Sequence, residues 1–503
     1  MSMDNIRITT NVENYRNDFM EMVRAFNPEN NEMDEDALIF DVQFVEKGNT
    51  LNIIINSGIF DNKNTDITLN TSNKNKFGNE YKYIENDNGN VLRCYTLEMT
   101  DDDSMHLHSL AKRYVKTRLY EDISEYTGKD LPYGSLTGIR PTKLYRETHE
   151  DREYFDKVLH VSSEKLSLIH NIVELQRDYY VSDDRIVDVF VNIPFCTTRC
   201  SYCSFISAEI GRVKKYIPDY VECVLQEIED VRRIVVDNNY EVRAVYIGGG
   251  TPTSLDDDSF RLIVNACNFG QIEYTVEAGR PDSITTSKLD IMKEAGVTRI
   301  SINPQSFSQK TLEIIGRHHL VEDIYKVYEE AKKYDFIINM DLIAMLPEET
   351  FDDFRHSVDE AIRLNPNNIT VHTLALKKGS KLREANYEQN MSSLAEKMVD
   401  YSREALEKAG YKPYYMYRQK YMSGNLENTG YTRGNDVCLY NIDIMEESLS
   451  IIANGAGGIS KRNFCAENRL ERLANPKGID VYLERNIDNI NNKYEFFRLN
   501  GLK

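Results

Sequence analysis

The stretch "NIPFCTTRCSYCSF", residues 192–205, holds three of the eight cysteines of this 503-residue chain. Cys196, Cys200 and Cys203 follow one another at spacings of four and three residues. Three unrelated buried cysteines would rarely cluster within eight residues. The spacing therefore indicates a site that uses three thiols and not four.

Composition limits what kind of site this is. A hydrophobic fraction of 41% and a charged fraction of 28% are ordinary for a soluble globular protein, and the length predicts more than one domain. The sequence contains no apolar run that could span a membrane and begins with a polar segment, so we expect a cytoplasmic protein with reduced thiols. A net charge of −20 argues against nucleic acid as a partner. We also expect a monomer.

Three ligand chemistries compete for the cysteine cluster. A disulfide is disfavoured by the compartment. Structural zinc needs four protein ligands, usually as two close pairs, and the remaining cysteines are scattered. These are Cys94, Cys223, Cys267, Cys438 and Cys465. A 4Fe–4S cluster held by three thiolates keeps one iron open for a small chelating ligand, and we favour it over zinc.

Strand-like and helix-like segments alternate downstream of residue 185. The predicted strands are 185–192, 242–247, 272–278, 297–303, 336–346 and 368–376. Helical periodicity is clear at 216–237, 258–268 and 287–296. Six βα units predict a parallel α/β sheet with right-handed crossovers, too few to close an eight-stranded barrel. We therefore predict an open, partial (β/α)6 barrel with functional groups at the carboxyl ends of its strands.

Glycines and polar residues follow these predicted strands. The turn "GGGTPT", residues 248–253, comes after the second strand, and three glycines would let the backbone approach a ligand closely. Glu277 ends the third predicted strand, Gln305 follows the fourth and Asp341 lies on the fifth, while Arg317 lies in "IGRHH" between the fourth and the fifth. Carboxylates, an amide and a guanidinium suit a ligand that carries an amine, a carboxylate and a ribose.

The C-x3-C-x2-C spacing resembles that of radical S-adenosylmethionine enzymes. More closely, "IPFC", "GGGTPT", "VEA", "PQSF", "IGRHH" and "DLIAMLPEET" resemble successive motifs of the oxygen-independent coproporphyrinogen III dehydrogenase family. That match covers about residues 185–385. The flanks "LTGIRPTKL" (136–144) and "YYMYRQKYMSGNLENTGY" (414–431) resemble the HemZ branch of the family.

The resemblance implies a 4Fe–4S cluster on Cys196, Cys200 and Cys203, with S-adenosylmethionine at the open iron. It implies cofactor contacts by Phe190, Tyr202, Gly248, Gly249, Gly250, Thr251, Glu277, Gln305, Arg317, Asp341 and Ala375. Phe190 departs from the family, which often has tyrosine there, so a hydrogen bond is in question. Asn192 stands where the family has histidine.

The implied reaction is oxygen-independent oxidative decarboxylation. A one-electron donor such as flavodoxin or ferredoxin reduces the cluster, and adenosylmethionine is cleaved to methionine and a 5′-deoxyadenosyl radical. Hydrogen abstraction from a substrate propionate, followed by loss of carbon dioxide and one electron, leaves a vinyl group. Two rounds convert coproporphyrinogen III to protoporphyrinogen IX in haem biosynthesis. Our candidates for binding the tetrapyrrole carboxylates are Arg140, Lys143, Arg418 and Lys420.

Two other functions remain open. Relatives carry haem, but the carrier branch has a His-Asn and a Tyr-Trp pair near its C-terminus. This chain has no tryptophan, and the corresponding stretch "DVCLYNID" (436–443) offers Cys438 as a possible thiolate ligand instead. A radical methyltransferase acting on a tetrapyrrole would share the same core.

The flanks of the core complete the domain prediction. We expect an accessory α+β domain over 1–150, a helical linker over 151–184, the radical core over 185–385 and a smaller substrate-covering C-terminal domain over 386–503. Within 1–150, the sequence predicts two strands in 37–58 and a long helix over 103–128. His106 and His108 would point to different faces of that helix, so we expect solvent-exposed or half-buried histidines rather than metal ligands.

Overall fold

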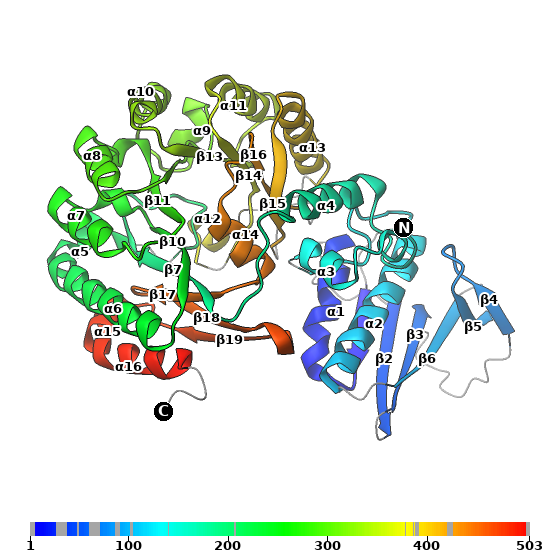
Figure 1. The fold of residues 1–503 in the computed structure, drawn as a ribbon. Helices are drawn as coiled ribbons and strands as arrows, with labels where there is room; N and C mark the ends of the chain where they lie inside the picture. Colours follow the sequence, from blue (N-terminus) through cyan, green and yellow to red (C-terminus); the bar gives the residue numbers. More distant parts are fainter. Residues whose placement is uncertain are drawn as a thin grey trace. The chain divides into compact units, whose positions relative to one another are not determined.

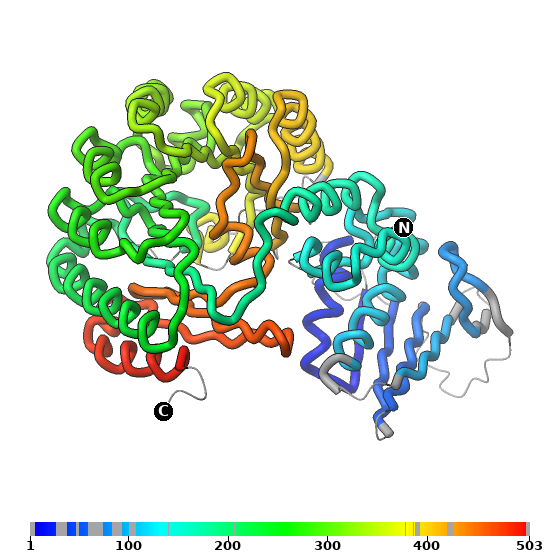
Figure 2. Tube along the Cα trace, viewed as in Figure 1, coloured from blue at the N-terminus to red at the C-terminus, as the bar shows by residue number. Residues whose placement is uncertain are grey.

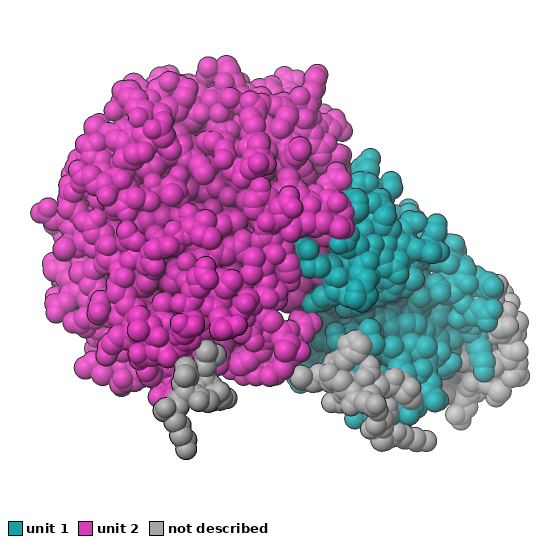
Figure 3. Space-filling view, in the orientation of Figure 1, with its two compact units in different colours: residues 1–141, 145–170 teal, residues 142–144, 171–503 magenta. Residues whose placement is uncertain are grey.

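The computed structural model divides the chain into two compact units. Unit 1 comprises residues 1–141 and 145–170, and unit 2 comprises 142–144 and 171–503 (Figure 3). The structure describes residues 6–26, 38–47, 50–59, 71–85, 91–100, 104–138, 140–205, 208–377, 379–385, 387, 392–419 and 426–498. No helix within these ranges is both long and apolar enough to cross a membrane.

Unit 1 is an α+β unit built on one mixed sheet. Its strand order is β1-β2-β3-β6-β5-β4, with only the β1–β2 pair parallel. The strands are β1 (Ile6–Thr10), β2 (Leu38–Lys47), β3 (Thr50–Ile59), β4 (Thr71–Lys74), β5 (Glu80–Glu85) and β6 (Val91–Thr100). The helices that pack in its core are α1 (Glu13–Phe26) and α2 (Ser104–Thr127).

The two strands and the long helix predicted in this region are confirmed as β2, β3 and α2. His108 on α2 accepts or donates a 2.7 Å hydrogen bond with the Tyr15 hydroxyl and lies 3.1 Å from Glu46. The side chain of His106 lies outside the described residues. Shorter helices, α3 (Pro141–Glu147), the π-helix η1 (Tyr154–Val158) and α4 (Ser163–Gln176), lead toward unit 2.

Unit 2 is built on one large curved sheet. Its order is β15-β16-β14-β13-β12-β11-β10-β7-β17-β18-β19. All six predicted strands are confirmed as neighbouring parallel strands. They are β7 (Ile186–Ile193), β10 (Glu241–Gly249), β11 (Glu273–Gly279), β12 (Arg299–Ile302), β13 (Ile337–Ala344) and β14 (Asn368–Thr373). The order is not closed into a ring, as an open partial barrel requires.

Helices cover the outer face of this sheet (Figure 1). They include α6 (Ile217–Asp237), α7 (Asp257–Ala266), α8 (Thr286–Glu294), α10 (Val321–Ala331), α11 (Phe351–Leu364) and α13 (Ser392–Lys408). The amphipathic pattern of α6 explains its position, because Val224, Ile228 and Val231 are buried against the sheet. Alternate residues of the parallel strands, such as Val187, Val189 and Val191 of β7, are apolar and belong to the core. The residues between them include buried polar side chains such as Asp188 and Glu273.

The C-terminal region extends the same sheet. β15 (Lys412–Tyr417) and β16 (Asn428–Thr432) join it beyond β14, while β17 (Ser450–Asn454), β18 (Ile459–Phe464) and β19 (Arg469–Ala474) join it beyond β7. The terminal helix α16 (Asn486–Phe497) packs against α6 (Figure 2). The structure thus places 386–503, for which the sequence predicted a separate domain, within unit 2. β17 adds a parallel strand beside β7 that the sequence analysis missed.

Candidate functional site

The three clustered cysteines lie in the loop that follows β7, at the carboxyl ends of the parallel strands. We call this side of the sheet the carboxyl edge. Cys196 and Cys200 are buried, and Cys203 is half-buried. The Cys203 backbone N–H donates to the Cys200 carbonyl at 3.2 Å. Burial and, to a smaller extent, the other two thiols raise the pKa of Cys203 to about 11, so the three sulfur atoms are close enough to interact electrostatically.

Neighbouring loops hold the cysteine loop in place. The Ser201 N–H donates to the Ile315 carbonyl at 3.0 Å, and the Thr198 hydroxyl donates to the Gly316 carbonyl at 3.1 Å. The Thr251 N–H donates to the Phe195 carbonyl at 2.7 Å, and its hydroxyl lies 3.5 Å from Cys196 Sγ. The loops after β10 and β12 therefore fix the positions of the thiols.

The glycine turn is also closely packed against neighbouring groups of the chain. A Cβ at Gly248 would come within 2.9 Å of the Glu277 carboxylate, and one at Gly249, where φ is +106°, would meet the Asn192 amide oxygen at 1.9 Å. A Cβ at Gly250 would meet the Phe195 carbonyl at 2.5 Å. The chain's own neighbouring groups therefore already require these glycines, whatever ligand binds there.

Asn192, which stands in place of the family's histidine, links two parts of unit 2. It is the residue before the last of β7, and its side-chain amide donates to the Ala456 carbonyl at 2.5 Å. Ala456 follows β17, the strand beside β7. Asn192 therefore connects the cysteine loop's strand to the C-terminal part of the sheet.

Glu277 lies near the end of β11 and faces the glycine turn. The Tyr246 hydroxyl donates to one of its carboxylate oxygens at 2.6 Å, and the Gly249 N–H donates to the other at 3.3 Å. Desolvation raises the pKa of Glu277 to about 7; Asp341 adds to the rise, while the bond from Tyr246 opposes it. This carboxyl group therefore changes its charge near neutral pH.

This titration leads to a direct prediction. Infrared difference spectra between wild type and Glu277→Gln should contain a carboxylic acid C=O band at about pH 5 that is lost by about pH 9, with a midpoint near 7. Burial raises the pKa of Glu349 to about 8, so its own band should persist in the Glu277→Gln protein as an internal control. A difference spectrum without the band at low pH would contradict the prediction.

Arg317 and Gln305 come from the segment between β12 and α10. Arg317 is buried, and its Nη1 donates to the Asn303 carbonyl at 2.5 Å. Although burial acts to lower it, the pKa of Arg317 is raised because Tyr202 and Cys200 lie against its guanidinium. Gln305 has a φ of +69°, and its backbone pairs with Asp341 and Ile343 of β13.

Several buried polar atoms at this edge have no hydrogen-bond partner among the described residues. They are Oε1 of Gln305, Oδ1 of Asn303, Nε of Arg317 and both ring nitrogens of His319. Burial, followed by Arg317, lowers the pKa of His319 to about 4, so its imidazole is neutral. Unpaired buried polar atoms are costly, and their concentration here fits a site that a polar ligand completes.

Asp341 and Ala375 complete the predicted set. Asp341 on β13 accepts from the Asn339 amide at 2.8 Å and lies 3.7 Å from His372 Nε2. His372 in turn forms a 3.2 Å hydrogen bond with the Tyr417 hydroxyl. Ala375 is half-buried just after β14. The structure thus brings the predicted cluster and cofactor residues together at the carboxyl edge.

An aromatic group that the sequence analysis missed lies beside these residues. The rings of Tyr246 and Tyr440 are stacked with centroids 4.5 Å apart, and Phe190 stacks on Tyr440 at 6.1 Å. Tyr440 comes from α14 (Leu439–Glu446), so no local motif could reveal it. Tyr246 was detectable, because residues two apart on a strand share a face and Gly248 was already a candidate.

Of the four candidate substrate cations, the structure places two, Arg418 and Lys143, on the large sheet of unit 2, and they lie at different edges. Arg418 is buried and follows β15, which runs parallel to β14, so it lies at the carboxyl edge. Lys143 lies 3.5 Å from Glu447, which precedes β17 and is therefore at the opposite, amino edge. Arg140 belongs to unit 1, and Lys420 lies outside the described residues.

Cys438, the possible thiolate ligand of a haem carrier, is also at the amino edge. It is buried, and its Sγ donates to Glu273 Oε1 at 3.2 Å. Glu273 is the first residue of β11, whereas Glu277 and Gly279 end that strand. Cys438 is therefore separated from the cysteine loop by the length of the strand.

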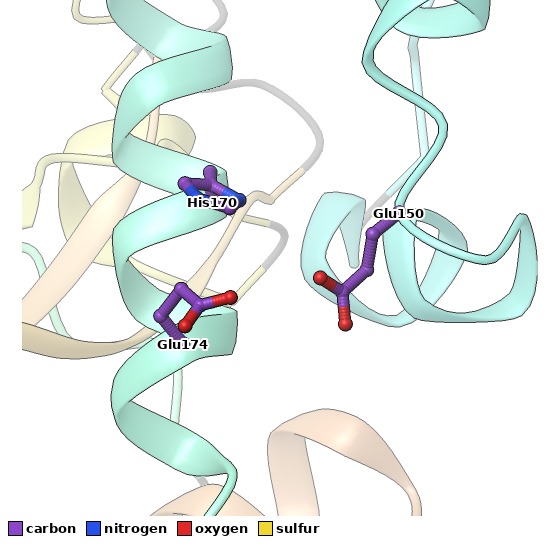
Figure 4. A group of neighbouring side chains, drawn as sticks. All are labelled: Glu150, His170 and Glu174. Carbon is purple, nitrogen blue, oxygen red and sulfur yellow. The ribbon is translucent and has the colours of Figure 1, made fainter.

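A second group of possible metal ligands, Glu150, His170 and Glu174, is drawn in Figure 4. His170 and Glu174 share one face of α4 because they are four residues apart. The Tyr145 hydroxyl and His170 Nδ1 form a 3.3 Å hydrogen bond. Glu150 belongs to unit 1 and Glu174 to unit 2, so we assign no metal site to this group.

Comparisons with known proteins agree on the core. The profile described as the Radical SAM superfamily matches residues 191–361. The protein named oxygen-independent coproporphyrinogen-III oxidase-like protein HemZ, from Bacillus subtilis (strain 168), is 35% identical over 422 residues, covering 78% of this chain and 82% of that protein.

Other relatives are named differently. The heme chaperone HemW of the same organism is 33% identical over 192 residues, which cover 37% of this chain and 49% of that protein. Among solved structures, the chain is similar to coproporphyrinogen III oxidase (HemN) from Escherichia coli, with a TM-score of 0.49 and 20% identity over 63% of this chain and 72% of that one.

Proposed function

Because the chain belongs to the radical SAM family of HemZ-type, oxygen-independent coproporphyrinogen III oxidase-like proteins, we propose that it converts coproporphyrinogen III to protoporphyrinogen IX. Each of two propionate side chains would lose a hydrogen atom, carbon dioxide and one electron and become a vinyl group. The observation that carries the proposal is the meeting of the three thiols with Glu277, Gln305, Arg317 and Asp341 at one edge.

Members of the superfamily use a 4Fe–4S cluster and S-adenosylmethionine, and so does this chain. When bound, these groups supply a carbon radical that abstracts a hydrogen atom. Cys196, Cys200 and Cys203 would each bind one iron. Their mutual proximity fits this role. Burial and the neighbouring thiols disfavour the ionised form of Cys203, and the positive charge of a bound metal would stabilise all three thiolates.

The strand-end residues would hold adenosylmethionine. The ionised Glu277 carboxylate would accept a hydrogen bond from the ammonium group of adenosylmethionine, and Asp341 would accept from its ribose hydroxyls. The amide oxygen of Gln305 has no partner among the described residues and could accept from the ammonium group or from a ribose hydroxyl. The Arg317 guanidinium would bind the carboxylate through its unpaired Nε–H. Tyr246, Tyr440 and Phe190 would exclude water beside the site.

The substrate carries four carboxylates and needs cations. Arg418 is the candidate that lies at the carboxyl edge, and a buried guanidinium there suits a propionate. Lys143, Arg140 and Lys420 remain candidates from residue chemistry alone. A flavodoxin or ferredoxin would supply the first electron, and a separate one-electron acceptor would receive the last.

The deciding experiment is anaerobic turnover. The reconstituted full-length protein, adenosylmethionine and a reductant are incubated with coproporphyrinogen III, and mass spectrometry follows the stepwise loss of two carboxyl groups. Cys196→Ala serves as the inactive control. A methylated tetrapyrrole or unchanged substrate would refute the proposal.

Haem carriage is the second candidate, because relatives named heme chaperone HemW cover part of the chain. The bonding of Cys438 to Glu273 at the amino edge disfavours the one thiolate ligand that the sequence suggested. Titration with haemin separates the two functions. Stoichiometric haem binding that Cys438→Ala abolishes, together with no turnover, would favour carriage.

Phe190 gives a further prediction. If the missing hydroxyl matters, Phe190→Tyr should tighten adenosylmethionine binding or raise turnover, within about tenfold, since one hydrogen bond contributes about 0.5–1.5 kcal/mol. Equilibrium binding and turnover are measured side by side. Phe269→Tyr, at a half-buried phenylalanine packed under Arg232, is the matched control. No change in either quantity would show that position 190 serves packing alone.

A further inference from the structure

A second guanidinium, from Arg280, faces the cysteine loop. Arg280 follows β11 and is 2% exposed. Its Nη1 donates to the Thr198 hydroxyl at 2.8 Å and to the Thr198 carbonyl at 3.3 Å, and it lies 4.0 Å from Cys200 Sγ. Neither the cysteine spacing nor the strand-end pattern singled out this residue.

Asp282 fixes the orientation of Arg280. Nε and Nη2 of the guanidinium each donate to a different Asp282 oxygen at 2.9 Å, which leaves Nη1 directed at the cysteine loop. Such a two-pronged pair orients the planar group. Burial of Asp282 acts to raise its pKa, but Arg280 holds the pKa of Asp282 below its usual range. The pair is therefore ionised.

The charges around Cys200 are unequal. Arg317 and Arg280 both bring permanent positive charges to this thiol, and the nearby His319 is neutral. Asp282 is half-exposed at 29%, whereas the Arg280 side chain is 3% exposed, so water screens the carboxylate more than the guanidinium. The cysteine loop therefore experiences a net positive field.

We propose that Arg280 is a positioning residue of the iron–sulfur site: it holds the Thr198–Cys200 segment and raises the reduction potential of the cluster. Reduction adds one negative charge to the cluster, and a buried guanidinium beside one of its thiolates stabilises that charge. The inference depends on the cluster common to the superfamily and holds whatever the substrate. It adds a property to the proposed site, because a cluster with a higher reduction potential can be reduced by a weaker electron donor.

The test is a redox titration of the reconstituted full-length protein, followed by electron paramagnetic resonance without substrate or adenosylmethionine. Arg280→Gln removes the charge and should lower the reduction equilibrium constant at least tenfold, which is 59 mV for one electron. Arg280→Lys keeps the positive charge but lacks the planar, two-pronged guanidinium. Its reduction potential should fall by less than half the drop seen in Arg280→Gln. Asp282→Asn should raise the potential. Arg261→Gln, at an exposed arginine of α7 that pairs with Glu294 of α8, should leave the potential unchanged.

Iron content is measured on every preparation. If Arg280→Gln binds a full cluster at the wild-type potential, the proposal is overturned. If Arg280→Gln cannot hold a cluster, the decision passes to Arg280→Lys and Asp282→Asn, and wild-type potentials in both would overturn it. Turnover does not enter this test, so a failed substrate assignment and a failed Arg280 assignment remain distinguishable.

Discussion

Cys196→Ala should abolish the 4Fe–4S cluster. The cluster with one open iron needs three thiolates. Cys196 is buried beside Thr251, and the loop has no fourth cysteine to replace it. After anaerobic reconstitution, the variant should have lost the broad visible absorption of the cluster and most of its iron, and turnover should disappear with them.

Cys223→Ala is the matched control. Cys223 is half-buried on α6, and its pKa is raised by burial and by nearby carboxylates rather than by the clustered thiols. The control should retain the iron content of the wild type. A full cluster in the Cys196→Ala protein would show that the three-cysteine assignment is wrong.

Arg317→Ala should remove nearly all turnover while the cluster persists. Loss of one side of a buried charged pair costs about 3–5 kcal/mol, a reduction of about 100-fold or more. All three thiolates remain, although Arg317 also faces Cys200, so iron content must be measured on the same preparation. The expected result is a strong loss of adenosylmethionine binding with near-normal iron.

Arg317→Lys refines this prediction. An ammonium keeps the charge but lacks the planar fork, so it should recover only part of the lost turnover. Arg261→Ala, at an exposed arginine, provides the control and should behave like the wild type. If Arg317→Ala turned over normally, the assignment of adenosylmethionine contacts from the fourth strand onward would be wrong.

The six parallel strands and the placement of the cluster were predictable for one reason. Parallel strands place their carboxyl ends at the same edge, so residues that end successive strands meet even when they are far apart in the chain. Glu277, Gln305 and Asp341 could therefore be grouped from their positions in or just after successive strands. Arg418 could not be placed this way, because the direction of β15 follows from two antiparallel pairings that no local pattern specifies.

By itself, the sequence determined the grouping of three thiols, the order of βα units and the main candidate residues on the later parts of the strands, because these depend on spacing and periodicity along the chain. Only the tertiary structure decided which side chains from distant elements contact one another. The glycines of the turn accommodate Glu277, Asn192 and Phe195, and Tyr440 reaches Phe190 from a distant helix. Arg280 faces Cys200 because Asp282 orients it and because the loop after β11 packs against the loop after β7. Such contacts depend on how crossovers pack in three dimensions, which hydrophobic periodicity does not encode.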